Sequence, residues 1–168
     1  MWHKTAVPLL LACIAFSATS WADEAAEQAA VAKQLPSVKV SLQQGLTAAA
    51  AQGVPISGKF EIDEGTFQLS IYTMQGGSFF EVVVDHATGK VAKSEPISEK
   101  EDLAAAKSQS AAMAKAKVTL KAAVDKAEQG LAGSRAVSVT PELKGGHAVA
   151  VVSLLKGGKS SSVSEPLE

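Results

Sequence analysis

The sequence is poor in cysteine and in aromatic residues. Its 168 residues include one Cys, two Trp and one Tyr, and aromatic residues make up 5% of the chain. A lone cysteine cannot close an intrachain disulfide, so burial of apolar side chains has to hold the fold together. Few aromatic rings also leave few platforms on which bases could stack. The composition therefore excludes a disulfide-stapled fold.

Neither sign of charge dominates the chain. Sixteen basic residues face 17 acidic ones, for a formal net charge of −1. Proteins that bind nucleic acid or an anionic membrane surface carry an excess of positive charge. We therefore expect no nucleic acid among the partners.

Residues 1–22 have the pattern of a bacterial Sec-type signal peptide. His3 and Lys4 precede an apolar run over residues 6–16, and Ser20–Ala22 offers small residues before Asp23. The run is shorter than the roughly 20 apolar residues of a membrane span, and no later stretch approaches that length. This pattern predicts cleavage between Ala22 and Asp23, a mature chain without a membrane span, and a periplasmic or secreted location.

Two other interpretations of this segment stay open. Leu10–Cys13 loosely resembles a lipobox, which would anchor the chain by lipidation at Cys13, and the apolar run could also be an ordinary core helix. If cleavage does follow Ala22, the mature chain loses its only cysteine and both tryptophans.

Short sequence similarities relate the two halves of the rest of the chain. Lys39–Leu42 returns as Lys117–Leu120, Gln52–Val54 as Gln129–Leu131, and the Gly pair 76–77 as 157–158. Landmarks in the same order at a nearly constant offset indicate an internal duplication. We therefore expect a tandem duplicated module.

Each predicted module begins with a helix and continues with strands. Apolar residues at helical spacing follow Ser41 and Thr119, two residues that favour helix N-caps. Strand-like alternation follows over residues 59–63, 67–72 and 80–84, and later over residues 137–139, 148–155 and 162–164. The fold class predicted is α+β, with each helix packed on one face of a three-stranded antiparallel meander and the other face open to water.

Alanine-rich segments precede both modules and are predicted to be leader and linker helices, exposed or only lightly docked. The expected organisation follows from these landmarks: signal peptide 1–22, leader helix 23–37, module one 38–97, linker helix 98–117 and a diverged module two 118–168.

The sequence contains no pattern typical of catalytic, cofactor-binding or metal-binding residues. The serines have no nucleophile-elbow setting, and the two histidines outside the signal peptide, His86 and His147, lack the spacing of zinc ligands. Both are expected to be exposed turn residues. We expect no cofactor and no enzyme activity.

The segment over residues 80–91 contains a recognisable motif. After the predicted strand 80–84, an Asp, a Thr and a Gly are spaced as in a tight turn. The segment resembles the closing motif of the PepSY family, and Val40–Leu42 resembles its opening motif. The closing-motif residues are Val82, Val84, Asp85, Thr88, Gly89, Lys90 and Val91.

The resemblance covers residues 38–97 well and module two only in outline, since no such motif follows its last strand. It implies a non-catalytic exported protein that binds another protein, with an envelope peptidase that it restrains as the candidate partner. The motif residues are expected to be structural. The alternative is a module that binds or senses a small ligand or a metal ion. The oligomeric state and the binding surface stay open.

Overall fold

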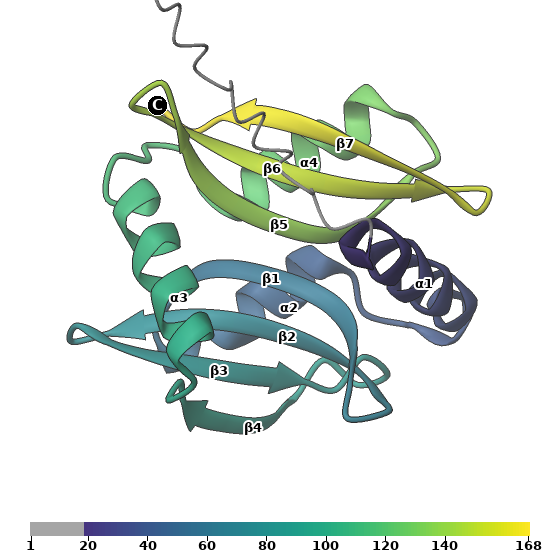
Figure 1. Cartoon of the computed structure of the whole chain (residues 1–168), viewed down its shortest axis with the longest axis horizontal. Helices are drawn as coiled ribbons and strands as arrows, with labels where there is room; N and C mark the ends of the chain where they lie inside the picture. The colour runs from purple at the N-terminus through teal and green to yellow at the C-terminus, as the bar shows by residue number, and fades with distance from the viewer. Residues whose placement is uncertain (1–18) are drawn as a thin grey trace, which may run out of the picture.

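A computed structural model describes residues 19–168 (Figure 1). Most of the predicted signal peptide therefore lies outside the described residues, and the predicted cleavage site lies in the first turn of α1. The helices are α1 (Thr19–Gln34), α2 (Leu42–Ala49), α3 (Lys100–Met113) and α4 (Leu120–Gly130), and short 3-10 turns follow α1 (Leu35–Ser37) and α2 (Ala50–Gln52). The strands are β1 (Val54–Asp63), β2 (Thr66–Gln75), β3 (Ser78–Val84), β4 (Val91–Pro96), β5 (Arg135–Lys144), β6 (His147–Lys156) and β7 (Lys159–Pro166).

All seven strands form one antiparallel sheet, in the order β4-β3-β2-β1-β5-β6-β7. The predicted tandem of two separate three-stranded modules is therefore wrong. β1 and β5 join in the middle through the pairs Gly58–Val139 and Lys59–Ser138, and the first meander has a fourth strand, β4. The join has a physical cause, because an unpaired β1 or β5 would leave a row of backbone donors and acceptors without partners.

The helices α2 and α4 pack side by side on one face of the sheet, which we call the back face. Ser41 and Gln44 form a capping box at the start of α2, and the Thr119 hydroxyl accepts a hydrogen bond from the Ala122 N–H at the start of α4. These bonds satisfy N–H groups that have no partner within a helix, and they confirm both predicted helix starts.

A single core runs along the back face beneath both helices. Its fully buried side chains come from both halves of the chain; they include Leu42, Leu69, Ile71, Val124, Val139, Val152 and Leu154. At roughly 25 cal/mol per Å² of apolar surface buried, this shared core is the main stabilising term. Because the core spans the seam between β1 and β5, neither half buries its apolar face alone.

Polar contacts also join the two halves. The Gln43 amide of α2 donates to Asp125 and Glu128 of α4, and Glu128 accepts the Ala136 N–H at 2.7 Å. The Arg135 guanidinium donates to the backbone carbonyls of Leu35, Val38 and Val40, at 3.0–3.4 Å. The segment between α1 and α2 is thus held by a residue of β5.

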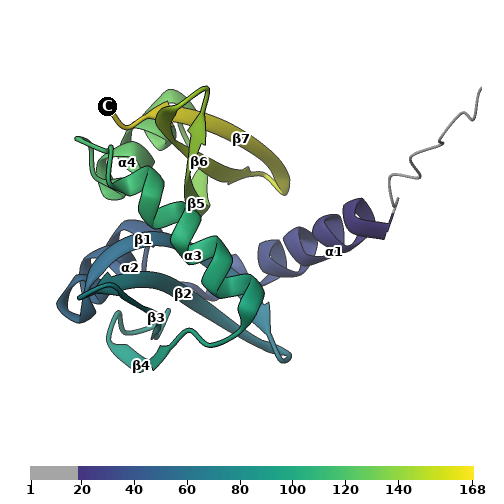
Figure 2. The ribbon, with the colours of Figure 1, turned by 60° about the vertical axis from the view of Figure 1, so that its left-hand side comes forward.

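The opposite face, which we call the front face, is partly covered by α3 (Figures 1 and 2). Ala106 and Ala112 of α3 are fully buried, Ser57 donates to the Gln109 side chain at 2.8 Å, and Ser110 lies 3.3 Å from the Met74 sulfur. The expected open second face and lightly docked linker helix are therefore only partly correct. Alanine side chains are small enough for a helix to approach the sheet closely without a strong apolar stripe.

Candidate functional site

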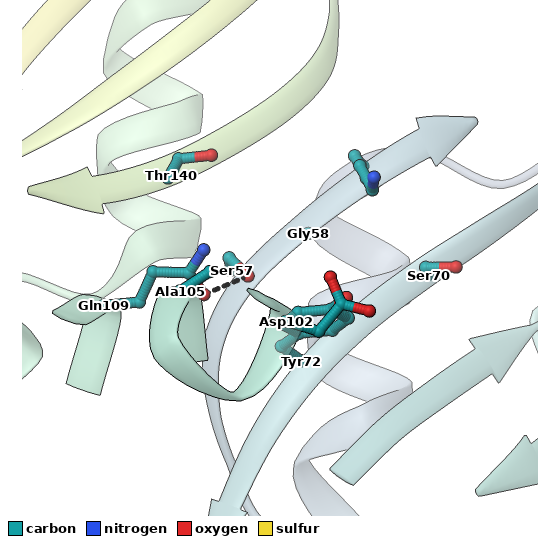
Figure 3. A pocket seen from close by; sticks show the side chains of 9 residues that line it. Ser57, Gly58, Ser70, Tyr72, Asp102, Ala105, Gln109 and Thr140 are labelled. Carbon is teal, nitrogen blue, oxygen red and sulfur yellow. Dashed lines mark hydrogen bonds between the residues drawn. The ribbon is translucent and has the colours of Figure 1, made fainter. Parts of the chain in front are cut away.

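Two hollows lie on the front face, one beside α3 and one beside α1. The α3-side hollow, shown in Figure 3, has a volume of about 190 Å³, and the α1-side hollow a volume of about 510 Å³. Lys59 of β1 lines both of them. Since Lys59 stands directly opposite Ser70 and Ser138 on the neighbouring strands, it occupies the middle of the sheet where the two halves meet.

Three carboxylates surround Lys59. Its ammonium forms an ion pair with Glu61, whose side chain is buried, and it lies within the electrostatic reach of Glu27 of α1 and Asp102 of α3. Burial works against the charge of Lys59, but the hydrogen bond and charge of Glu61, with the two helix carboxylates, outweigh it and raise the pKa of Lys59. Lys59 therefore stays protonated, and three negative charges face one positive charge.

Most residues that line the α3-side hollow are polar. Hydroxyls of Ser57, Ser70 and Thr140 line it, together with Tyr72 and Asp102 (Figure 3). Burial raises the pKa of the Tyr72 phenol well above its ordinary value, and the Asp102 and Glu81 carboxylates raise it further. The phenol is thus a neutral hydrogen-bonding group and no base at physiological pH.

The α1-side hollow combines hydroxyls with apolar surface. Ser138, Ser153 and Ser162 stand opposite one another on β5, β6 and β7 and form a row of small side chains across the sheet. The apolar part of the lining comes from α1 and the sheet; it comprises Val31, Phe60, Val137, Val151 and Leu155. Such a lining accommodates a side chain or a small molecule that is partly apolar.

The residues of the predicted PepSY motif lie elsewhere, and none of them lines either hollow. Val82 and Val84 belong to the back-face core. Asp85 closes the turn after β3, where one carboxylate oxygen accepts the N–H groups of Ala87 and Thr88 and the Thr88 hydroxyl. Gly89 has a φ of +75°, a conformation that favours glycine. Lys90 and Val91 then lead into β4, where Val91 pairs with Val84.

This turn holds the start of α2. The His86 carbonyl accepts the N–H groups of Lys39 and Val40, at 3.0 and 3.1 Å, just before the Ser41 cap. The start of α4 is held in the same manner, since the Leu167 carbonyl accepts the N–H groups of Lys117 and Val118. The turn after β3 thus fixes the start of α2 through the His86 carbonyl.

Replacing Asp85 by alanine is expected to lower the melting temperature at neutral pH. Hydrogen bonds from Thr88 and Ala87 lower the pKa of Asp85, so its contribution is present above the ordinary aspartate pKa and is lost as pH falls through the lowered value. The melting temperatures of wild type and variant should therefore differ at pH 7, and the difference should shrink as pH falls through the lowered pKa of Asp85. Asp63→Ala, at the exposed β1–β2 turn, is the control; an equal loss there would contradict the assigned role.

The histidines take no part in the site. His147 is exposed and its ring lies 3.1 Å from Glu168, as predicted for a surface histidine. His86 differs from the prediction, because its ring is half-buried and packs edge-on against Phe67 at 5.1 Å between ring centroids. Within residues 19–168, His, Asp and Glu side chains form no group of three that could hold a metal ion.

Sequence reasoning missed the residues that line the hollows. Lys59, Asp102 and Glu27 come from a strand and two helices that are far apart in the sequence, and no local spacing joins them. The alternation of Lys59, Glu61 and their apolar neighbours indicates one polar face. That the helices carrying Asp102 and Glu27 border this same face depends on tertiary packing.

None of the helices in the described part of the chain combines the length and the apolar character needed to cross a membrane. Comparisons with protein-family models, with curated proteins and with solved structures find no match for this chain.

Proposed function

We propose that this protein is a non-catalytic binding module of the bacterial cell envelope, exported by its N-terminal segment, and that it binds a segment of an exported partner protein in the front-face hollows. The observation that carries the proposal is the arrangement around Lys59: two open hollows meet at a charged group between the carboxylates of α1 and α3. An envelope peptidase is the first candidate partner, on the basis of the PepSY resemblance of residues 38–97.

The charge of the hollows favours a basic side chain of the partner. Glu27 and Asp102 are exposed on the two walls, while Glu61 is committed to Lys59. A lysine or arginine has an apolar stem and a cationic head, so its stem fits against Val151 and Leu155 of the α1-side hollow and its head can approach Glu27. The neighbouring serines supply hydroxyls that can bond to the backbone of the segment.

Peptides from candidate exported peptidases test this proposal. Fluorescently labelled peptides with a central arginine should bind with a Kd roughly ten-fold or more lower than that of the same peptides without it. The double charge reversal Glu27→Lys with Asp102→Lys should abolish the difference, whereas Asp63→Lys, an equivalent reversal outside the hollows, should preserve it. Equal affinity for both peptides would contradict the assignment to this site.

The partner class is tested separately. The purified protein should slow the hydrolysis of a reporter substrate by an envelope peptidase whose segment it binds, and the double reversal should remove this effect. If the protein bound the peptidase without slowing hydrolysis, it would be a binding partner only, and the restraining role would be refuted.

The volume of the α1-side hollow favours a second candidate, a small ligand of the envelope. About 510 Å³ lies within the range of small-molecule sites, roughly 300–1,000 Å³. A ligand present at 1,000 times its Kd would add about 4 kcal/mol to the free energy of unfolding. A thermal-shift screen with metabolites and metal ions distinguishes this candidate, because it predicts a large shift in the absence of any peptide.

A further inference from the structure

The outer strand β7 presents a free and almost uncharged edge. It pairs with β6 over its whole length without a register shift, and among the described residues no strand pairs with its other side. Figure 1 shows it at the rim of the sheet, with α4 behind. Its five central residues, 160–164, contain four serines and a valine, and its proline is the last residue of the strand. Long uncharged edges are the ones that recruit another strand.

The other edge is protected. β4 has six residues, ends at Pro96, shows a register irregularity against β3, and carries the Lys93–Glu95 ion pair at 2.8 Å. Short length, charge, proline and irregular pairing are the devices by which natural sheets prevent strand addition. Strand addition is therefore expected at β7.

The register of β6 and β7 shows which backbone groups point outward. The two-residue turn at Gly157 and Gly158, with φ of 56° and 78°, makes Lys156 and Lys159 a hydrogen-bonded pair. Hydrogen-bonded and non-hydrogen-bonded pairs alternate along the two strands from this pair onward. The hydrogen bond from the Leu167 N–H to the Ala148 carbonyl, at 3.0 Å, falls where this alternation expects a hydrogen-bonded pair. The N–H and C=O groups of Ser160, Ser162 and Ser164 therefore point away from β6.

We propose that two copies of this chain pair through β7, antiparallel and centred on Ser162. In this register Ser162 faces its own copy and Ser160 faces the other copy's Ser164, so that all outward backbone groups of these residues find partners. The same register places Lys159 opposite the other copy's Glu165 at both ends of the pair.

Charge complementarity favours a second copy of this chain as the partner of β7, and it favours this register. Lys159 is exposed and has no ion-pair partner within the described chain, while the buried Glu165 already accepts Lys126 through one oxygen at 2.7 Å and keeps the other. Opposite charges directly across a strand pair stabilise it. Antiparallel pairing of one strand with itself also gives a closed two-fold dimer instead of an open fibre. The dimer would form through the outward backbone N–H and C=O groups of β7, whereas the Ser162 side chain lines the α1-side hollow, so the pairing does not use the side chains of the peptide-binding role proposed for the hollows.

Single cysteines on β7 test the register directly. In a Cys13→Ser background, Ser162→Cys should form a disulfide-linked dimer under mild oxidation, because the two Cα atoms lie about 5.5 Å apart in a hydrogen-bonded pair. Ser160→Cys alone and Ser164→Cys alone should not, since each cysteine is four residues out of register with its own copy. A mixture of those two variants should cross-link again. Equal cross-linking of all three single variants, or none, overturns the proposal.

Sedimentation of the uncross-linked protein tests the association itself. Wild type should show a reversible, concentration-dependent dimer, and Ser162→Pro, which removes an outward N–H at the centre of the edge, should raise its dissociation constant at least roughly ten-fold. Ser162→Ala keeps the backbone N–H and should dimerise like wild type. A wild-type chain that remains monomeric at all concentrations, or a Ser162→Ala loss equal to that of Ser162→Pro, refutes the pairing. Circular dichroism confirms that the variants are folded.

Discussion

Replacing Arg135 by alanine is expected to lower the free energy of unfolding by about 3 kcal/mol. Its guanidinium donates to three backbone carbonyls of the segment between α1 and α2, and it lies 5.9 Å from the centre of the Phe60 ring. Alanine removes these hydrogen bonds and the cation–aromatic contact, and of the three carbonyls that of Leu35 still accepts the Val38 N–H. Chemical denaturation followed by circular dichroism measures the loss.

Two variants show whether the geometry of Arg135 or only its charge is responsible. Arg135→Lys keeps the charge but cannot reach several carbonyls with one planar fork, so it should recover less than half of the loss. Lys156→Ala removes another cation that bonds to a carbonyl, that of Ala132, at an exposed position. Its expected effect is about 0.5 kcal/mol or less. Full recovery by lysine, or an equal loss at Lys156, would contradict this account.

Substituting valine for Gly45 is expected to cost about 2–3 kcal/mol. A Cβ at this position in α2 would clash with Cδ2 of Leu69, a fully buried side chain of β2, and would lie 3.1 Å from its Cγ. The close approach of helix and sheet therefore depends on the missing side chain, and a larger residue has to push α2 away from the core.

Gly130 supplies the matched control. It also lies in a helix, at the end of α4, but a Cβ there would meet no atom within 4 Å. Gly130→Val should therefore change the free energy of unfolding by less than about 0.5 kcal/mol, since no contact is disturbed. If the two valine variants were equally stable in urea titrations, crowding against Leu69 would not be the reason for a glycine at position 45.

Local features of the fold could be predicted because neighbouring residues determine them. Ser41 and Thr119 cap their helices through bonds to groups three residues away. The Asp85 turn is held by bonds to Ala87 and Thr88. Each of these patterns lies within a few residues, and each appears in the structure where the sequence places it.

The joined sheet could not be predicted in this manner. Alternation along β1 and β5 shows which side chains face inward, but it does not show which strand lies alongside. The pair Gly58–Val139 depends on the shared core of α2 and α4, which belongs to both halves. For the same reason the carboxylates around Lys59 were not visible as a group. Asp102 lies on α3, which packs on the sheet through small alanines, and Glu27 lies on α1, which forms a wall of the α1-side hollow.

The narrow seam between β1 and β5 has a consequence for the order of folding. Hairpins such as β1–β2 and β5–β6 close short loops, whereas Gly58 and Val139 must meet across about half of the chain. Closing a long loop costs more chain entropy than closing a short one, and nonlocal contacts slow the passage over the folding barrier. The two meanders are therefore expected to form early, and the union of β1 with β5 to be the late, rate-limiting event. Until that event, both central strands are exposed edges in the nascent chain, so the middle of the finished sheet is the place most open to mispairing during synthesis.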